Sequence, residues 1–176
     1  MPQRHFDGTQ ASARRTERCS RHDTGHAPIL PRKNRRVANI VMHRTATAAD
    51  IDAILEFWRS SAEDTDRNDD RPSLEQLLRR DPEALLLAVA NDEIIGSVIA
   101  GWDGWRCHLY RVAVRPDWRR QGVVRELVAS AEQRFRDAGG RRADAMVLEG
   151  NELGQVAWRA LGYAPQPQWR RWVKPL

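Results

Sequence analysis

Apolar and polar positions follow a helical period in two stretches that come after a short apolar segment at residues 40–42. The apolar segment predicts a first strand. After Thr47, apolar residues recur three and four positions apart, which predicts a helix whose buried face is formed by Ile51, Ile54, Leu55 and Trp58. Thr47 and Asp50 have the spacing of a capping box, with Asp in place of the usual Glu. Residues 73–76 predict the capped start of a second helix, which ends before Pro82.

Three strands are predicted next, because the helical period gives way to continuous and alternating apolar patterns. Residues 84–90 and 94–100 are apolar runs separated by Asn91 and Asp92, which predicts a hairpin. Residues 107–114 predict a third strand. Alternate positions of that strand are expected to share one face, and these are His108, Tyr110, Val112 and Val114.

A long helix is predicted from about residue 121 to 138, and Gly139 and Gly140 end it. Its expected buried face consists of Val124, Leu127, Val128, Ala131 and Phe135. The remaining predictions are a strand at 143–148, a helix at 152–161 and a final strand at 170–173. The order β-α-α-β-β-β-α-β-α-β describes an α/β fold in which helices pack on a mixed sheet.

Charge divides the chain into two parts. Residues 1–38 carry nine bases and three acids, whereas residues 39–176 carry 20 bases and 21 acids. The net charge of +6 in the first part therefore accounts for the basic pI of about 10.0, and the second part is nearly neutral. Residues 1–38 also lack any apolar period, so we predict a disordered basic tail followed by one domain at 39–176. The main support for a nucleic-acid function of the whole protein would be its positive charge. Because that charge lies in residues 1–38, it does not support such a function for the domain.

Three interpretations of the tail remain open. A solvated tail without a dedicated role is favoured over an electrostatic arm for acidic partners such as nucleic acid, in which residues 32–36 would take part. The third is a start-site artefact, because a compact domain could begin near Met42. Cys19, His22 and His26 lack a fourth ligand nearby, so no metal site is expected.

The sequence also bears on the compartment. No stretch approaches the roughly 18 apolar residues that a membrane helix needs, and the start has no signal-peptide apolar core. The two cysteines, Cys19 and Cys107, are too few for a disulfide framework. We therefore expect a cytoplasmic protein without a membrane partner.

Residues 112–124 combine a strand end, a polar turn and a helix start. A helix start offers unpaired backbone N–H groups and the positive end of the helix dipole. Gly122 lets a ligand approach the backbone closely, and Arg119 and Arg120 add positive charge. These features are typical of a phosphate or pyrophosphate cradle, with an ordinary turn bearing surface arginines as the alternative.

The stretch Arg119-Arg120-Gln121-Gly122-Val123-Val124 resembles the acetyl-CoA signature of the GCN5-related N-acetyltransferase (GNAT) family, Arg/Gln-x-x-Gly-x-Gly/Ala. Val147, Asn151 and the segment 158–163 resemble the second half of that family's pattern. The order of elements from about residue 40 to 176 also matches the family, in its single-domain bacterial type. The tail has no counterpart.

The resemblance implies an acyl-CoA N-acyltransferase fold with acetyl-CoA as cosubstrate. It implies that the pantetheine arm lies between the third long strand and the next parallel strand, and that the pyrophosphate binds the amides of residues 120–124. A positioned amine then attacks the acetyl carbonyl directly, without a covalent enzyme intermediate. The implied cofactor-binding residues are Val112, Ala113, Val114, Arg119, Arg120, Gln121, Gly122, Val123, Val124, Asn151 and Trp158.

The chain departs from the family pattern at two informative positions. Val124 stands where Gly or Ala is usual, and Trp158 replaces the Tyr that often protonates the leaving thiolate. An indole N–H donates a hydrogen bond but is no acid at neutral pH, so we expect water or another group to protonate the thiolate. Tyr110, His108 and Glu149 are the candidate catalytic bases, and packing or solvation is the competing interpretation of each.

The acceptor is expected to be a primary amine on a small molecule or a protein. The acidic run 64–70 would attract a cationic amine, although such runs are commonly only solvated loops. The seven tryptophans are expected mainly in the core, with Trp105 in a turn as a possible acceptor contact. Two alternatives to an enzyme are a catalytically weak acyl-CoA-binding module and nucleic-acid association through the tail. A homodimer is expected by analogy only.

Overall fold

The structure is a computed structural model that describes residues 40–62, 69–172 and 174. Its main elements are, in chain order, β1 (Met42–Thr45), α1 (Ile51–Ser61), α2 (Arg71–Arg80), β2 (Leu85–Ala90), β3 (Glu93–Trp102), β4 (Cys107–Val114), α3 (Val123–Asp137), β5 (Ala143–Ala145) and α4 (Glu152–Ala160). Single 3-10 turns precede α1 and α3. The predictions for the tail, for Cys19, His22 and His26, and for residues 64–68 and Val173 lie outside the described residues.

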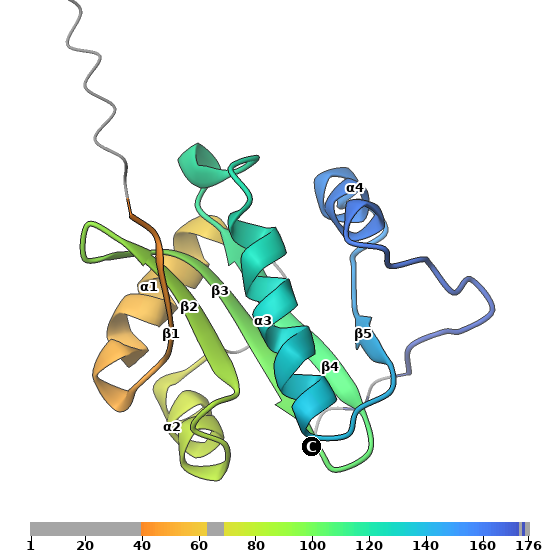
Figure 1. Ribbon diagram of the computed structural model, residues 1–176, viewed down its shortest axis with the longest axis horizontal. Coiled ribbons are helices and arrows are strands. Elements are labelled where there is room, and N and C mark those ends of the chain that lie inside the picture. Colours follow the sequence, from red (N-terminus) through yellow and green to blue (C-terminus); the bar gives the residue numbers. More distant parts are fainter. Residues whose placement is uncertain (1–39, 63–68, 173, 175–176) are drawn as a thin grey trace, which may run out of the picture. The chain divides into compact units, whose positions relative to one another are not determined.

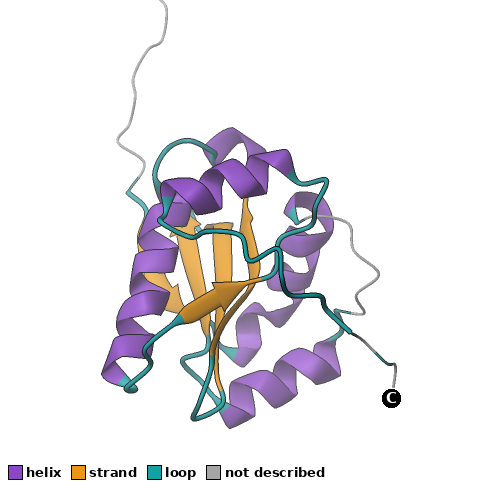
Figure 2. Cartoon of the chain, turned by 90° about the vertical axis from the view of Figure 1, so that its right-hand side faces the viewer, coloured by secondary structure: helices purple, strands orange, loops and turns teal. Residues whose placement is uncertain are grey.

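The strands form one sheet in the order β1-β2-β3-β4-β5, antiparallel as far as β4 and parallel between β4 and β5. Figure 1 shows α3 on one face of the sheet and α1 and α2 on the other, and Figure 2 shows the same layers from the β5 edge. Each face has its own core. The α3 core includes Val98, Leu127 and Val128, and the α1–α2 core includes Ile54 and Leu85. The predicted α/β fold with a mixed sheet is therefore confirmed.

Local chemistry explains where the elements begin and turn. Asn91 and Asp92 both have positive φ, 52° and 63°, which a two-residue hairpin of the type I′ class requires. Ala90 pairs with Glu93 across this turn, so the predicted hairpin is confirmed.

Among the described residues, no helix is both long and apolar enough to cross a membrane.

The predicted capping box before α1 is also confirmed. The backbone N–H of Thr47 donates to Asp50 Oδ2 at 2.8 Å, and the Thr47 hydroxyl donates to the same oxygen at 2.8 Å. Arg44, from β1, donates to both carboxylate oxygens of Asp50 at 2.8 and 2.6 Å. The hydrogen bond from Arg44, followed by those from Thr47, holds the pKa of Asp50 well below its ordinary value despite partial burial.

Three predicted element starts are wrong by a few residues. The first strand is Met42–Thr45 rather than 40–42, because these residues pair with β2. The N-cap of α2 is Asp70 rather than Ser73, because the Asp70 side chain accepts from the Ser73 N–H at 2.8 Å. The long helix begins at Val123 and not near 121, since the left-handed backbone of Gly122 interrupts the helical path. As a result Val123 is buried, whereas Val124, predicted inward, is only half-buried.

The C-terminal predictions need larger corrections. β5 ends at Ala145 instead of 148, because β4 has no pairing with the chain beyond that residue. Residues 170–172 form no strand, so the predicted final strand is wrong over that range. The expectation of buried tryptophans holds for Trp58 and Trp118 but is wrong for three that are exposed, namely Trp105, Trp169 and Trp172.

We predict that Asp50→Asn lowers the free energy of unfolding by about 1–3 kcal/mol at neutral pH, because the amide has no negative charge and replaces one of the two oxygens that accept from Arg44 with an N–H donor. The folded-state pKa of Asp50 is depressed, so this stabilisation is present above the ordinary carboxylate pKa and is lost as the pH falls through the folded value. Chemical denaturation should show the difference between wild type and variant shrinking below about pH 4. Asp92→Asn, in an exposed turn, is the control and should change little; an unchanged Asp50→Asn difference at pH 3 would contradict the account.

Candidate functional site

β4 and β5 diverge after three pairs of residues. Cys107 pairs with Ala143, His108 with Asp144 and Leu109 with Ala145, and the pairing ends there. β4 continues to Val114 with β3 on its other side only. The backbone N–H and C=O groups on the β5 side of residues 112–114 therefore have no strand partner among the described residues, which leaves an open strand edge inside the fold.

A β-bulge interrupts β4 at the point of divergence. Ser97 pairs with Ala113 and Ile99 pairs with Tyr110, so Val98 alone lies opposite two residues of β4. One of these two residues, Arg111, has a φ of 45°. The bulge shifts the alternation by one residue, so the prediction of one shared face for His108, Tyr110, Val112 and Val114 is wrong. The two valines pack toward the α3 core, whereas Tyr110 shares the opposite face with Ala113.

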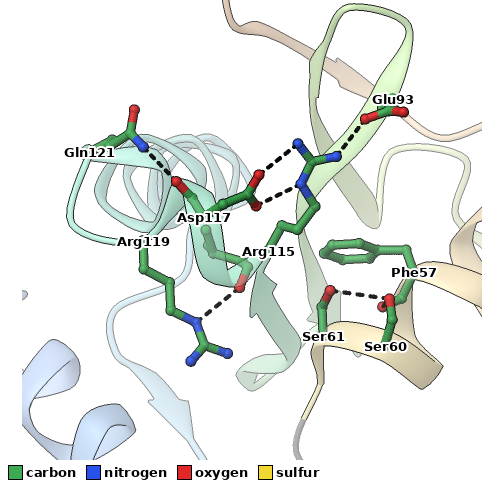
Figure 3. Close-up of polar contacts among 9 residues, drawn as sticks. Phe57, Ser60, Ser61, Glu93, Arg115, Asp117, Arg119 and Gln121 are labelled. Carbon is green, nitrogen blue, oxygen red and sulfur yellow. Dashed lines mark hydrogen bonds and ion pairs between the residues drawn. The ribbon is translucent and has the colours of Figure 1, made fainter.

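Side chains brace the loop that joins β4 to α3 (Figure 3). Arg115 bonds Asp117 through Nε at 2.8 Å and also forms an ion pair with Glu93 of β3. Gln121 Nε2 donates to the Asp117 carbonyl at 2.8 Å, and Arg119 Nε donates to the Val114 carbonyl at 3.2 Å. These contacts fix the path of the chain into α3.

The start of α3 presents free backbone donors. Gly122 is its N-cap with a φ of 90°, and the first backbone bond of the helix runs from Glu126 N–H to the Gly122 carbonyl. Within the described part of the chain, no acceptor bonds the amides of residues 122–125. A Cβ at Gly122 would meet nothing within 4 Å, so the space in front of these amides is open. The positive end of the helix dipole lies there too.

The opposite wall comes from the chain after β5. Asn151 caps α4, because its Oδ1 accepts from the Gly154 N–H at 2.6 Å. Trp158 packs edge-on against Tyr163 with ring centroids 4.8 Å apart. The Tyr163 hydroxyl donates to Glu132 of α3 at 3.0 Å, and burial together with this carboxylate raises the pKa of Tyr163. The hydrogen bond joins the end of α4 to α3.

These walls enclose a cleft of about 590 Å³. Ten of the predicted binding residues line it, as well as one predicted base: Tyr110, Val112, Ala113, Val114, Arg119, Arg120, Gly122, Val123, Val124, Asn151 and Trp158. Gln121 braces the loop and does not line the cleft, and the other two candidate bases, His108 and Glu149, lie outside its lining as well.

Sequence reasoning missed several lining residues. Ser61 and Ala62 come from the end of α1, Arg111 from the bulge and Arg125 from the first turn of α3. Apolar side chains of the far wall were also missed, namely Met146, Leu148, Leu153 and Val156. Arg125 follows Gly122 by three residues, and this closeness to the predicted helix start was a readable signal. Nothing local in the sequence shows that the end of α1 reaches the cleft.

Asp144 is a further residue that the sequence did not single out. Its Oδ1 lies 2.5 Å from His108 Nδ1, across the parallel pair that joins β4 and β5. The His108 ring in turn contacts the Tyr110 ring at 5.7 Å between centroids. A line of titratable side chains thus leads from the cleft at Tyr110 to the edge of the sheet.

The cleft suits a ligand with an anionic end and an extended arm. The unpartnered amides at the start of α3 lie in the same cleft as Arg119, Arg120 and Arg125, a combination that fits a diphosphate. The open edge of β4 fits an arm that carries amide groups, because such an arm can add to the sheet as a strand does. The residues present therefore fit coenzyme A, whose diphosphate and pantetheine have these features.

Comparison with known proteins agrees with this geometry. Residues 51–163 match the model of the Acetyltransferase (GNAT) family. An acetyltransferase of Pectobacterium atrosepticum is 33% identical over 114 residues, which cover 65% of this chain and 81% of that protein. An uncharacterized N-acetyltransferase of Yersinia pestis is 31% identical over 117 residues, covering 66% of this chain and 83% of that protein. The chain belongs to the GNAT family and is an acetyltransferase that uses acetyl-CoA.

Solved structures show the same fold at lower identity. An aminoglycoside N-acetyltransferase, AAC(6')-Iy in complex with CoA, superposes with a TM-score of 0.65 at 18% identity over 84% of this chain and all of that one. A predicted acetyltransferase from Clostridium acetobutylicum with acetyl-CoA has a TM-score of 0.62 at 12% identity, over 76% of this chain and 96% of that one.

We predict that Gly122→Ala weakens acetyl-CoA binding by about tenfold, because a Cβ at a φ of 90° strains the backbone that presents the free amides. Gly104→Ala is a matched control, since Gly104 has a φ of 91°, has equally open surroundings and lies in the β3–β4 turn outside the cleft. Both variants should lose about 1 kcal/mol of stability. Titration calorimetry should show weaker binding for Gly122→Ala alone, and equal affinities would contradict the assignment of the helix start.

Proposed function

We propose that this GNAT acetyltransferase transfers the acetyl group of acetyl-CoA to a primary amine by direct attack. The observation that carries the proposal is the cleft itself, which combines an open strand edge with a cationic mouth at the start of α3. The Yersinia pestis relative named as an N-acetyltransferase supports nitrogen as the acceptor atom. The fold shared with an aminoglycoside N-acetyltransferase supports it as well.

Direct attack follows from the nucleophiles available. Among the described residues that line the cleft there is no cysteine or histidine. The Ser61 hydroxyl also lines the cleft, and its one partner among the described side chains is Ser60, at 3.3 Å. A serine without a neighbouring base is a poor nucleophile, so an acetyl-enzyme intermediate on it is disfavoured. The substrate amine is then the attacking group.

The protein's task is to position the two substrates and to stabilise the charge that develops during the transfer. Acetyl-CoA supplies an acetyl group activated as a thioester. The amides at the start of α3, with Arg120 and Arg125, hold the diphosphate, and residues 112–114 orient the arm through backbone bonds. A backbone N–H of β4 beside the bulge would donate to the oxyanion that develops on the acetyl carbonyl. Fixing the amine near the thioester lowers the entropic part of the barrier.

Tyr110 is our candidate for the group that relays the amine proton: its phenolic oxygen accepts this proton while its own O–H proton passes to water. It lines the cleft one residue before the bulge, while the two other candidate bases do not line it. The His108 ring, which is held by Asp144, contacts the Tyr110 ring. Trp158 lines the cleft but its indole is no acid, so water protonates the departing thiolate.

We expect a panel of primary amines to contain acceptors that release coenzyme A, detected by a thiol reagent. With the best amine, Tyr110→Phe should lower kcat by about 100-fold, the ordinary size of an acid–base contribution. Tyr163→Phe is the matched control, because its hydroxyl bonds Glu132 away from the cleft and its loss should reduce stability but spare kcat. An unchanged kcat in Tyr110→Phe would contradict the role of Tyr110.

A catalytically weak acyl-CoA-binding module is the second candidate. The half-buried Val124 at the mouth and Trp158 in place of a tyrosine favour it. Tight acetyl-CoA binding without coenzyme A release for any amine would support this candidate over the enzyme.

We also infer that residues 39–176 form the catalytic domain and that the basic residues 1–38 are dispensable for acetyl transfer. Coenzyme A release by the full chain and by a chain starting at Asn39 should then be equal. A loss of activity on truncation would contradict this division, and nucleic-acid binding that disappears with the tail would assign the tail its electrostatic role.

A further inference from the structure

Arg111 has a backbone conformation that needs an explanation. Its φ of 45° lies in the left-handed region, which a long side chain rarely adopts. Such conformations are unfavourable and persist only where the surroundings hold them. The described residues around Arg111 do so with two separate sets of contacts.

The first set holds the Arg111 carbonyl. The hydroxyl of Ser97, a fully buried residue of β3, donates to this carbonyl at 2.9 Å. The indole Nε1 of Trp58, from α1, donates to the Ser97 oxygen at 2.8 Å. Two buried hydrogen bonds in series thus tie the bulge to α1 on the far side of the sheet from α3.

The second set holds the Arg111 side chain, which is only 9% exposed. The guanidinium carbon lies 5.5 Å from the centroid of the Trp58 ring. Arg111 Nε also donates to Asp69 Oδ1 at 2.9 Å, and a second nitrogen pairs with the other oxygen of Asp69. Asp69 immediately precedes the N-cap of α2. Trp58 is therefore linked to Arg111 in two ways. Its indole N–H bonds Ser97, which bonds the Arg111 carbonyl, and its ring lies against the Arg111 guanidinium group.

We propose that Arg111 is a positioning residue of the acetyl-CoA site, and that the closed circuit Trp58–Ser97–Arg111 sets how the open edge of β4 is presented to the cleft. The residues of that edge, 112–114, follow Arg111 directly and line the cleft with it. A change in the peptide orientation at Arg111 would rotate their N–H and C=O groups. Because hydrogen bonds weaken steeply as their angle departs from linearity, such a rotation would weaken the bonds to an arm bound along the edge.

The circuit has a second consequence for the cleft. Ser61 and Ala62, at the end of α1, lie three and four residues after Trp58 and line the same cleft as the edge of β4. Trp58 thus anchors the helix that supplies one wall and the bulge that supplies another. The spacing of the two walls depends on the same indole ring. This inference rests on the proposed use of the cleft by acetyl-CoA.

Ser97→Ala and Trp58→Phe test the circuit in the full chain. Ser97→Ala removes the donor to the bulge, and Trp58→Phe keeps an aromatic ring under Arg111 but removes the indole N–H. Calorimetric titration with acetyl-CoA should give affinities about fivefold weaker for each variant, the loss expected for one buried hydrogen bond. In turnover with an identified amine, KM for acetyl-CoA should rise in the same proportion, and kcat should fall as well, because the proposed oxyanion donor lies beside the same bulge.

Ile54→Val is the control for stability alone, because Ile54 is fully buried one turn before Trp58 and does not line the cleft. It should lower the melting temperature without changing the acetyl-CoA affinity. Wild-type affinity in Ser97→Ala, or an equal loss of affinity in Ile54→Val, would overturn the positioning role. If the wild-type protein itself failed to bind acetyl-CoA, the proposed function would fall and this inference with it.

Discussion

The separation of β4 from β5 beyond Leu109 is the constraint on which the site depends. Three residue pairs hold the two strands together, and the bulge at Arg111 then turns β4 while the chain after β5 leads into the cap of α4. Full pairing would place the backbone groups of residues 112–114 in a hydrogen-bond ladder. Because the strands separate, those groups face a cleft instead, and α3 and α4 form its remaining walls.

The opening also determines the kind of chemistry the cleft can support. Its mouth gathers backbone donors and guanidinium groups, whereas its far wall is built largely from apolar side chains such as Leu148 and Val156. Apolar walls lower the local dielectric constant, so the charges at the mouth act more strongly on an anionic ligand than they would in water. A site of this kind accelerates acetyl transfer by placement and electrostatics, and it does not need a covalent nucleophile.

Local patterns predicted the elements and the mouth of the site. The apolar period located both faces of the sheet, and Gly122 with its neighbouring arginines marked the start of α3. The bulge could not be predicted, because an arginine at positive φ leaves no trace in composition and its partner Ser97 is a distant strand neighbour. The contact of His108 with Asp144 depends likewise on a parallel register. The final strand predicted at 170–173 is absent over residues 170–172, which pair with no other strand.

The most direct test of the account is the amide spectrum of the isotopically labelled protein during titration with acetyl-CoA. The account predicts saturable shifts concentrated in two groups of backbone amides, residues 122–125 at the start of α3 and residues 112–114 on the open edge of β4. Shifts confined to other parts of the chain, or no shifts at millimolar acetyl-CoA, would contradict the claim that the diverging strands form the binding cleft.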